Sequence, residues 1–300
     1  MAPSQQSLIR EVIRLDWIVY IAVSIFFIIE EVKVTRPVPF QVPFHVDDER
    51  YWAPYMTGEV SETTITLVGT ASFVILVIIE FLLQATRLRD QAVLTGTPAE
   101  DTFVTAGFAA LRLGFAGAIT VLLAEGTCDL FREHVGELTP DFGYQCLGAA
   151  AQQWSHGNGT TITSDAGCMA PVLVGRQGFL SGHVTLAFAF AIFSGIHAVT
   201  RTPRICHLRG LPPFVGRILY QLYLVYVMGA FLLAWGVAQN AVTHNKTFSF
   251  NTFGSMILAT MVALAVFFAI DSAIQRDLEN DYPQLAEDIT AQEKTPFASS

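Results

Sequence analysis

Apolar residues fill six long windows of the sequence, and polar segments separate them. The windows run approximately over residues 15–32, 64–84, 104–124, 179–199, 216–238 and 253–273. Each is apolar around its whole helical circumference, whereas an amphipathic helix of a water-soluble domain keeps one polar face. A bilayer core is about 30 Å thick, and a helix needs roughly 20 mainly apolar residues to cross it. The pattern therefore predicts an all-α integral membrane bundle of six transmembrane helices.

The same pattern divides the chain into three parts. We expect a cytoplasmic segment over residues 1–14, a six-helix membrane domain over 15–274 and a polar cytoplasmic tail over 275–300. Acidic Glu30 and Glu31 follow the first window, where a cleaved signal peptide would have small residues. We therefore expect the first window to remain as a signal anchor.

Composition supports a membrane protein and argues against nucleic-acid binding. Hydrophobic residues make up 52% of the chain and charged residues 14%, and the mean hydropathy is +0.46. The net charge is −9, and the basic residues are scattered rather than clustered on one segment. The four cysteines form no paired Cys/His spacing. We therefore expect no metal site and no cofactor.

Basic residues near the window ends predict the orientation. They concentrate in the short loops after the second and fourth windows and at both termini, which the positive-inside rule assigns to the cytoplasm. Glycosylation sequons begin at Asn158 and Asn245, and both fall on the side that the charges assign to the exterior or lumen. We expect a multi-pass protein with both termini cytoplasmic. A plasma membrane and an endomembrane fit this topology equally well.

A long polar loop over residues 126–178 separates the third and fourth windows. Loops of this length usually carry function or disorder, and we expect this one to form a structured external cap. Its Cys146 and Cys168 lie on the predicted oxidising side, where a disulfide would add about 3 kcal/mol by the chain-entropy estimate. The alternative is two free thiols. Cys128, close to a window end, is expected to be packed rather than paired.

Two charged residues lie inside the apolar windows and need partners. At a rise of about 1.5 Å per residue, the predicted depths of Glu80 and Arg112 differ by only ~5 Å. We therefore predict a structural ion pair between them. The functional alternative is a proton or ion relay, for which only His197 is available at a similar depth.

The segment over residues 175–183 is the strongest candidate for chemistry. It reads Gly-Arg-Gln-Gly-Phe-Leu-Ser-Gly-His and opens the fourth window. Ser181, the N–H groups of a helix start and His183 would form an anion-binding cradle with an adjacent proton donor. Ordinary N-capping by Ser181 is the alternative. Arg176, five residues ahead of Ser181, favours the anion site.

This segment resembles the second signature of the type 2 phosphatidic acid phosphatases, the lipid phosphate phosphatases. The resemblance extends over residues 15–275 and is nearest to the phospholipid phosphatase-related, or plasticity-related, branch. Further matches are Asp47-Asp48 and Pro54-Tyr55 in the first external loop, Glu80 in the second window, and residues 136–142 leading to Cys146.

The resemblance implies a reaction in which three signatures meet at the outer membrane face. A His of the third signature attacks the lipid phosphate, and the His of the second protonates the leaving alcohol, which places His183 at the acid position. In the first signature Arg132 stands at the Lys position, but Thr139 replaces the Arg that precedes Pro140.

The third signature is lost in either register that the sequence allows. One register places Asn240, Lys246 and Phe250 at its Arg, His and Asp positions, and the other places Ala241, Thr247 and Asn251 there. His244 lies nearby but out of step, so it is a weak candidate for the nucleophile.

We therefore expect a catalytically deficient protein that retains a phosphate-binding site formed by Arg132, Arg176, Ser181 and Gly182. It would bind a phospholipid, a lysophospholipid or other membrane lipid, or a protein partner, and a homo-oligomer is also compatible. One alternative is an active lipid phosphate phosphatase that uses His244. Another is a lipid or ion transporter.

Overall fold

The computed structural model is mostly helical and describes residues 23–24, 43–54, 60–95, 99–135, 137–148, 161–162, 168, 178–201 and 213–281. Five long helices dominate it: α3 (Glu62–Thr95), α4 (Ala99–Val135), α6 (Gly182–Arg201), α7 (Pro213–Thr243) and α8 (Ser249–Asp281). The smaller elements are β1 (Phe44–His45), η1 (Glu49–Tyr51), α5 (Phe142–Leu147) and β2 (Thr161–Ile162).

The five long helices are each long and apolar enough to cross a membrane. They confirm five of the six predicted windows and are compatible with a multi-pass membrane protein. Of the first window the structure describes only residues 23–24, which are helical, so the sixth span lies outside the described residues. The helices extend beyond the apolar windows because polar residues continue them. In particular, α8 continues to Asp281, so the first residues of the predicted polar tail are helical.

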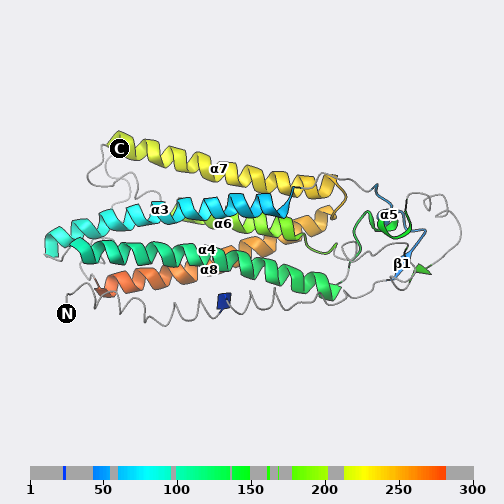
Figure 1. The fold of residues 1–300 in the computed structure, drawn as a ribbon, viewed down its shortest axis with the longest axis horizontal. Coiled ribbons are helices and arrows are strands. Elements are labelled where there is room, and N and C mark those ends of the chain that lie inside the picture. Colours follow the sequence, from blue (N-terminus) through cyan, green and yellow to red (C-terminus); the bar gives the residue numbers. More distant parts are fainter. Residues whose placement is uncertain are drawn as a thin grey trace, which may run out of the picture.

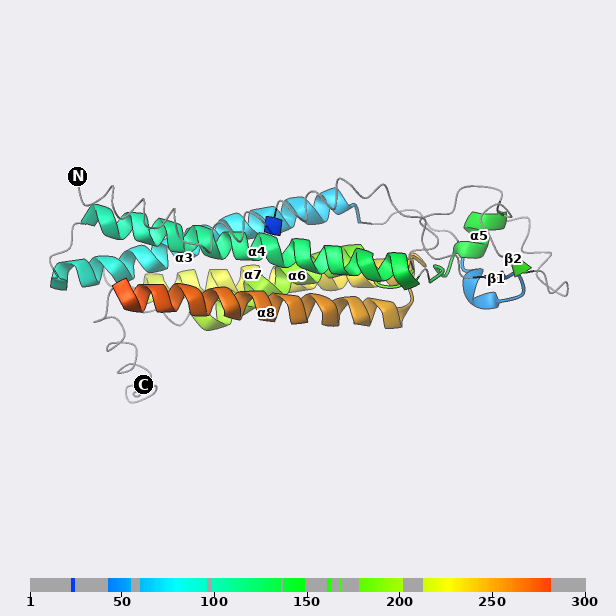
Figure 2. The same cartoon turned by 90° about the horizontal axis from the view of Figure 1, so that it is seen from below.

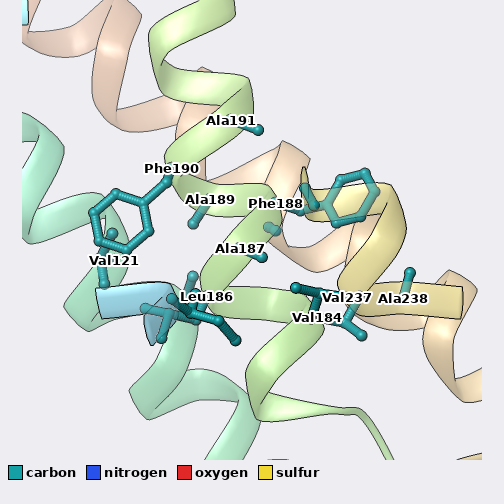
Figure 3. Close-up of a cluster of buried hydrophobic side chains, with 14 of the residues drawn as sticks. Val121, Val184, Leu186, Ala187, Phe188, Ala189, Phe190, Ala191, Val237 and Ala238 are labelled. Atoms are coloured by element: carbon teal, nitrogen blue, oxygen red, sulfur yellow. The ribbon is translucent and has the colours of Figure 1, made fainter. Parts of the chain in front are cut away.

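Helix α6 is the central element of the bundle. The long helices run alongside one another, and α6 contacts α3, α4, α7 and α8 (Figure 1). Most of its residues are buried, including the run from Val184 to Ala191. In Figure 3, Phe190 extends from α6 to lie beside Val121 of α4. Phenylalanine and alanine alternate along this part of α6. The alanines let neighbouring helices approach closely, and the phenylalanines fill the space between them.

A small cap lies beyond one end of the long helices (Figure 2). We define the cap as residues 43–54, 137–148, 161–162 and 168. Its buried cluster consists of Phe44, Val46, Trp52, Leu138, Phe142 and Cys146. β1 and β2 pair antiparallel across the cap.

A disulfide joins Cys146 to Cys168 and confirms the predicted pairing. Cys128 is a buried free cysteine, which agrees with the expected packed position. At the surface of the cap, Arg50 donates hydrogen bonds to the Asp48 carboxylate and thereby lowers the pKa of Asp48. The bridge and these local contacts all lie within the cap.

Candidate functional site

Three chain segments that are far apart in the sequence meet where the cap joins the bundle. They are residues 137–141, residues 178–182 and residues 246–255. The Gly178 N–H donates to the Glu137 carbonyl at 2.7 Å, and the Asn251 amide donates to the Gly178 carbonyl at 3.0 Å. The Ser181 N–H donates to Ser255 Oγ at 2.7 Å. These contacts bring together the segments that the sequence resemblance assigned to three signatures.

Close backbone approach at Gly178 makes this meeting possible. A Cβ added there would lie 2.6 Å from the Leu138 carbonyl oxygen and 3.0 Å from the Thr139 nitrogen. Such distances are too short for any side chain with a Cβ, so only glycine fits between the cap and the start of α6.

The start of α6 lies beside a guanidinium group. A Cβ added at Gly182 would lie 3.2 Å from Arg132 Nη1, and the same nitrogen donates to Asp129 at 2.9 Å. Ser181 Oγ lies 3.5 Å from the Val184 nitrogen, which is the arrangement of an N-cap. Arg132, Ser181 and Gly182 therefore lie together, whereas Arg176 lies outside the described residues.

His183, the position that the resemblance assigns to the acid, is half-buried in the first turn of α6. It adjoins Gly182 in the chain and so lies at the end of the helix that faces Arg132. A helix start provides free N–H groups and a partial positive charge, which together favour an anion.

The buried Asp141 carboxylate is the hydrogen-bond acceptor for several side chains around Thr139. The Thr139 hydroxyl donates to Asp141 at 2.6 Å, and the Gln145 amide donates to the same oxygen at 2.8 Å. Lys246 Nζ lies 3.4 Å from the other Asp141 oxygen, and Asp141 is fully buried. Thr139 and Lys246 thus bind a carboxylate of the protein itself.

Thr247 and Asn251 are also engaged within the protein. The Thr247 hydroxyl donates to the Gly178 carbonyl at 3.3 Å, and the Asn251 amide donates to a Glu137 carboxylate oxygen at 2.9 Å. Both residues are buried. Their side chains act here as hydrogen-bond donors that connect residues 246–255 to the other two segments.

Asn240 and His244 lie at the end of α7 and form local contacts. The Asn240 side chain accepts a hydrogen bond from the Val60 N–H at 3.2 Å, so it stabilises the entry to α3. His244 Nδ1 lies 2.9 Å from the Asn240 carbonyl oxygen and 3.3 Å from Thr243 Oγ1. The His244 imidazole is therefore fixed against the end of its own helix.

The sequon residue Asn245 occupies the turn that follows. It has a φ of 57°, and its amide nitrogen, the atom that would carry a glycan, donates to the Pro54 carbonyl at 3.0 Å. Glycosylation at Asn245 would require this contact to break. The other sequon residue, Asn158, lies outside the described residues.

An apolar groove of about 300 Å³ adjoins the meeting point. Its walls come from the end of α4, the approach to α6 and the first turns of α8, and they consist of Phe131, Phe179, Leu180, Phe250, Asn251, Gly254, Ile257, Leu258 and Met261. Asn251 is its polar member, and Phe131 packs edge-on against Phe179. This groove was not predicted from the sequence. Its only signal in the sequence is phenylalanine at the ends of three helical segments.

Glu80 is partnered by residues other than Arg112, with which we predicted an ion pair. Glu80 Oε2 lies 3.1 Å from His197 Nε2, Oε1 accepts from the Gln84 amide at 2.6 Å, and Arg201 lies 4.0 Å away. Arg112 is also buried, on α4. The prediction used depth alone, and depth does not determine which helix face a side chain occupies.

The Glu80 cluster continues toward the helix ends remote from the cap. His197 Nδ1 lies 2.5 Å from the Tyr223 hydroxyl, and Arg201 pairs with Asp271 of α8. Glu80 and His197 are fully buried. The alternating charges and hydrogen bonds account for the burial of these groups.

Within the described residues, no group of three or more His, Cys, Asp or Glu side chains is placed to hold a metal ion. No protein-family model, curated protein or solved structure matches the chain. The relation to the lipid phosphate phosphatases therefore stays a prediction from the sequence.

Proposed function

We propose that this chain is a multi-pass membrane protein, related to the lipid phosphate phosphatases, that binds a phospholipid at the cap end of its bundle without hydrolysing it. The observation that carries the proposal is an apolar groove that ends beside a cation and a helix start. Phe131 lines the groove and precedes Arg132, and Leu180 lines it and precedes the α6 start.

The groove matches the chemistry of a lipid chain. Eight of its nine lining residues are apolar or glycine, and Asn251 is the remaining one. An acyl chain would bury apolar surface against Ile257, Leu258 and Met261. The phosphate would then reach the Arg132 guanidinium and the N–H groups of the α6 start, which favour an anion.

Absence of hydrolysis follows from the side chains at the positions of the third signature. Nucleophilic catalysis by histidine needs an imidazole activated by a neighbouring group. Lys246, Thr247 and Asn251 occupy the positions concerned and form hydrogen bonds within the protein. The His244 imidazole is held at the end of α7, which disfavours the alternative of an active phosphatase that uses it.

The orientation that we propose places the cap outside the cytoplasm. Disulfides persist in oxidising compartments, and the Cys146–Cys168 bridge lies in the cap. The basic residues of the sequence assign the opposite helix ends, and both termini, to the cytoplasm. The lipid would then enter the groove from the outer or lumenal leaflet.

Phosphate release from detergent-solubilised phosphatidic and lysophosphatidic acid tests the absence of hydrolysis. We expect the purified wild-type chain to release no more phosphate than a His183→Ala variant, because the attacking imidazole is missing from both. An active lipid phosphate phosphatase in the same micelles verifies the assay. Turnover by the wild type that His183→Ala abolishes would contradict the proposal.

A further inference from the structure

We propose that the bound phospholipid carries a primary ammonium headgroup, as in phosphatidylethanolamine, and that the Glu137 carboxylate selects it over a phosphate monoester. This inference rests on the proposed function. It goes further by assigning a headgroup class and a specificity-determining residue that the sequence did not indicate.

Glu137 contacts the one polar residue of the groove wall, although it does not itself line the groove. Its Oε2 atom accepts a hydrogen bond at 2.9 Å from the amide of Asn251, which itself lines the groove. Its backbone carbonyl accepts from the Gly178 N–H, so the main chain is fixed on the same side. Glu137 is half-buried, so part of its surface is accessible.

Three cations among the described residues form their ion pairs with carboxylates other than Glu137. Arg132 pairs with Asp129 at 2.9 Å, and Lys246 pairs with Asp141 at 3.4 Å. On the cap, Arg50 forms its ion pair with Asp48 and interacts electrostatically with Glu137 at longer range. Within the described part of the chain, Glu137 has no cation within ion-pair distance, and its carboxylate is met by an amide alone.

This charge distribution disfavours a phosphate monoester. A phosphate monoester carries a charge of about −1.5 to −2 near neutral pH, and it would have to lie close to an unneutralised carboxylate. A phosphodiester with an attached ammonium group carries one negative and one positive charge. Its phosphate can contact Arg132 and the α6 start, while its ammonium group donates charge-assisted hydrogen bonds to Glu137.

A competition between two lipids tests the inference. Native mass spectrometry of the detergent-purified full chain would measure the bound lipid at equal concentrations of dioleoyl phosphatidylethanolamine and dioleoyl phosphatidic acid at pH 7.4. We expect the wild type to favour phosphatidylethanolamine by about tenfold, the effect of one charge-assisted contact. Glu137→Gln should bring the ratio close to one, because its amide oxygen can still accept from Asn251 but carries no charge.

Glu49→Gln is the matched control. Glu49 is an exposed carboxylate on η1 of the cap, so its substitution removes the same charge and should leave the wild-type ratio unchanged. Equal binding of both lipids by the wild type, or the same preference in Glu137→Gln, would overturn the inference while leaving the proposed function intact. Failure to bind either lipid would overturn both.

Discussion

At the residue scale, Asn251 shows how the candidate site is built. Its amide nitrogen donates both to the Glu137 carboxylate at 2.9 Å and to the Gly178 carbonyl at 3.0 Å. Both partners are acceptors, so this position requires a donor. The carboxylate that the lipid phosphate phosphatases carry in their third signature could not make these contacts. Asn251 and its two acceptors therefore form an internal hydrogen-bond network.

Replacing Asn251 by Asp should destabilise the protein. The variant would place a second carboxylate beside Glu137 and leave the Gly178 carbonyl without its donor, at a cost of about 1–3 kcal/mol. The thermal unfolding midpoint in detergent, followed by tryptophan fluorescence, measures the effect. Adding Glu137→Gln to the variant should recover part of the loss. Unfolding of Asn251→Asp at the wild-type temperature would show that the contact is unimportant.

Some residue contacts could be predicted from the sequence, and others could not. The disulfide partners followed from their shared polar loop. The N-cap arrangement of Ser181 was given only as the alternative to the anion site. The partner of Glu80 did not, because a helix can rotate about its axis without changing the depth of a residue. Its actual partner, His197, lies on α6. The sequence pattern did not indicate which side of α6 faces α3.

At the element scale, the packing of α6 depends on glycine on its neighbours. A Cβ added at Gly69 of α3 would overlap the ring of Phe190, which is buried and packs against Phe73 at a centroid distance of 4.7 Å. The ring therefore has little room to move. Because helix association in a membrane depends on close packing, this contact sets the distance between α3 and α6.

Gly69→Ala should lower stability by about 1–3 kcal/mol, the usual cost of overpacking a core. Gly229→Ala is the matched control, because a Cβ at this position of α7 meets nothing within 4 Å. The control should be neutral or slightly stabilised, since alanine favours a helix over glycine by about 1 kcal/mol. Unfolding midpoints of the two purified variants should differ accordingly, and equal midpoints would refute the packing argument.

The five described long helices could be predicted from apolar length alone, whereas their ends could not. Hydrophobic windows report the part of a helix that fits the bilayer, and polar helical turns continue beyond it. α8 shows this clearly, because it continues past the last apolar window to Asp281. A structured external cap was predicted from the loop between the third and fourth windows. Its strands and short helices were not, because they have too few residues to give a periodic pattern.

At the scale of the whole molecule, α6 is connected to α8 at both of its ends. At the cap end, the Ser181 N–H donates to Ser255 of α8. At the opposite end, Arg201 pairs with Asp271 of α8 and lies near Glu80 of α3. These contacts hold the start of α6 in a fixed position beside Arg132 and the groove. A fixed, preorganised site suits binding, because little conformational entropy is lost when the ligand enters.

Photolabelling tests the central claim that a phospholipid chain occupies the groove between α4 and α8. The probe is a phosphatidylethanolamine with a diazirine in its acyl chain, in nanodiscs of phosphatidylcholine, and the labelled residues are mapped by peptide mass spectrometry. We predict labelling concentrated at Ile257, Leu258 and Met261, which Leu258→Trp suppresses by filling the groove. Leu232→Trp on the exposed face of α7 should not suppress it. Labelling spread over α7 and α8 alike, and unchanged in Leu258→Trp, would contradict the account.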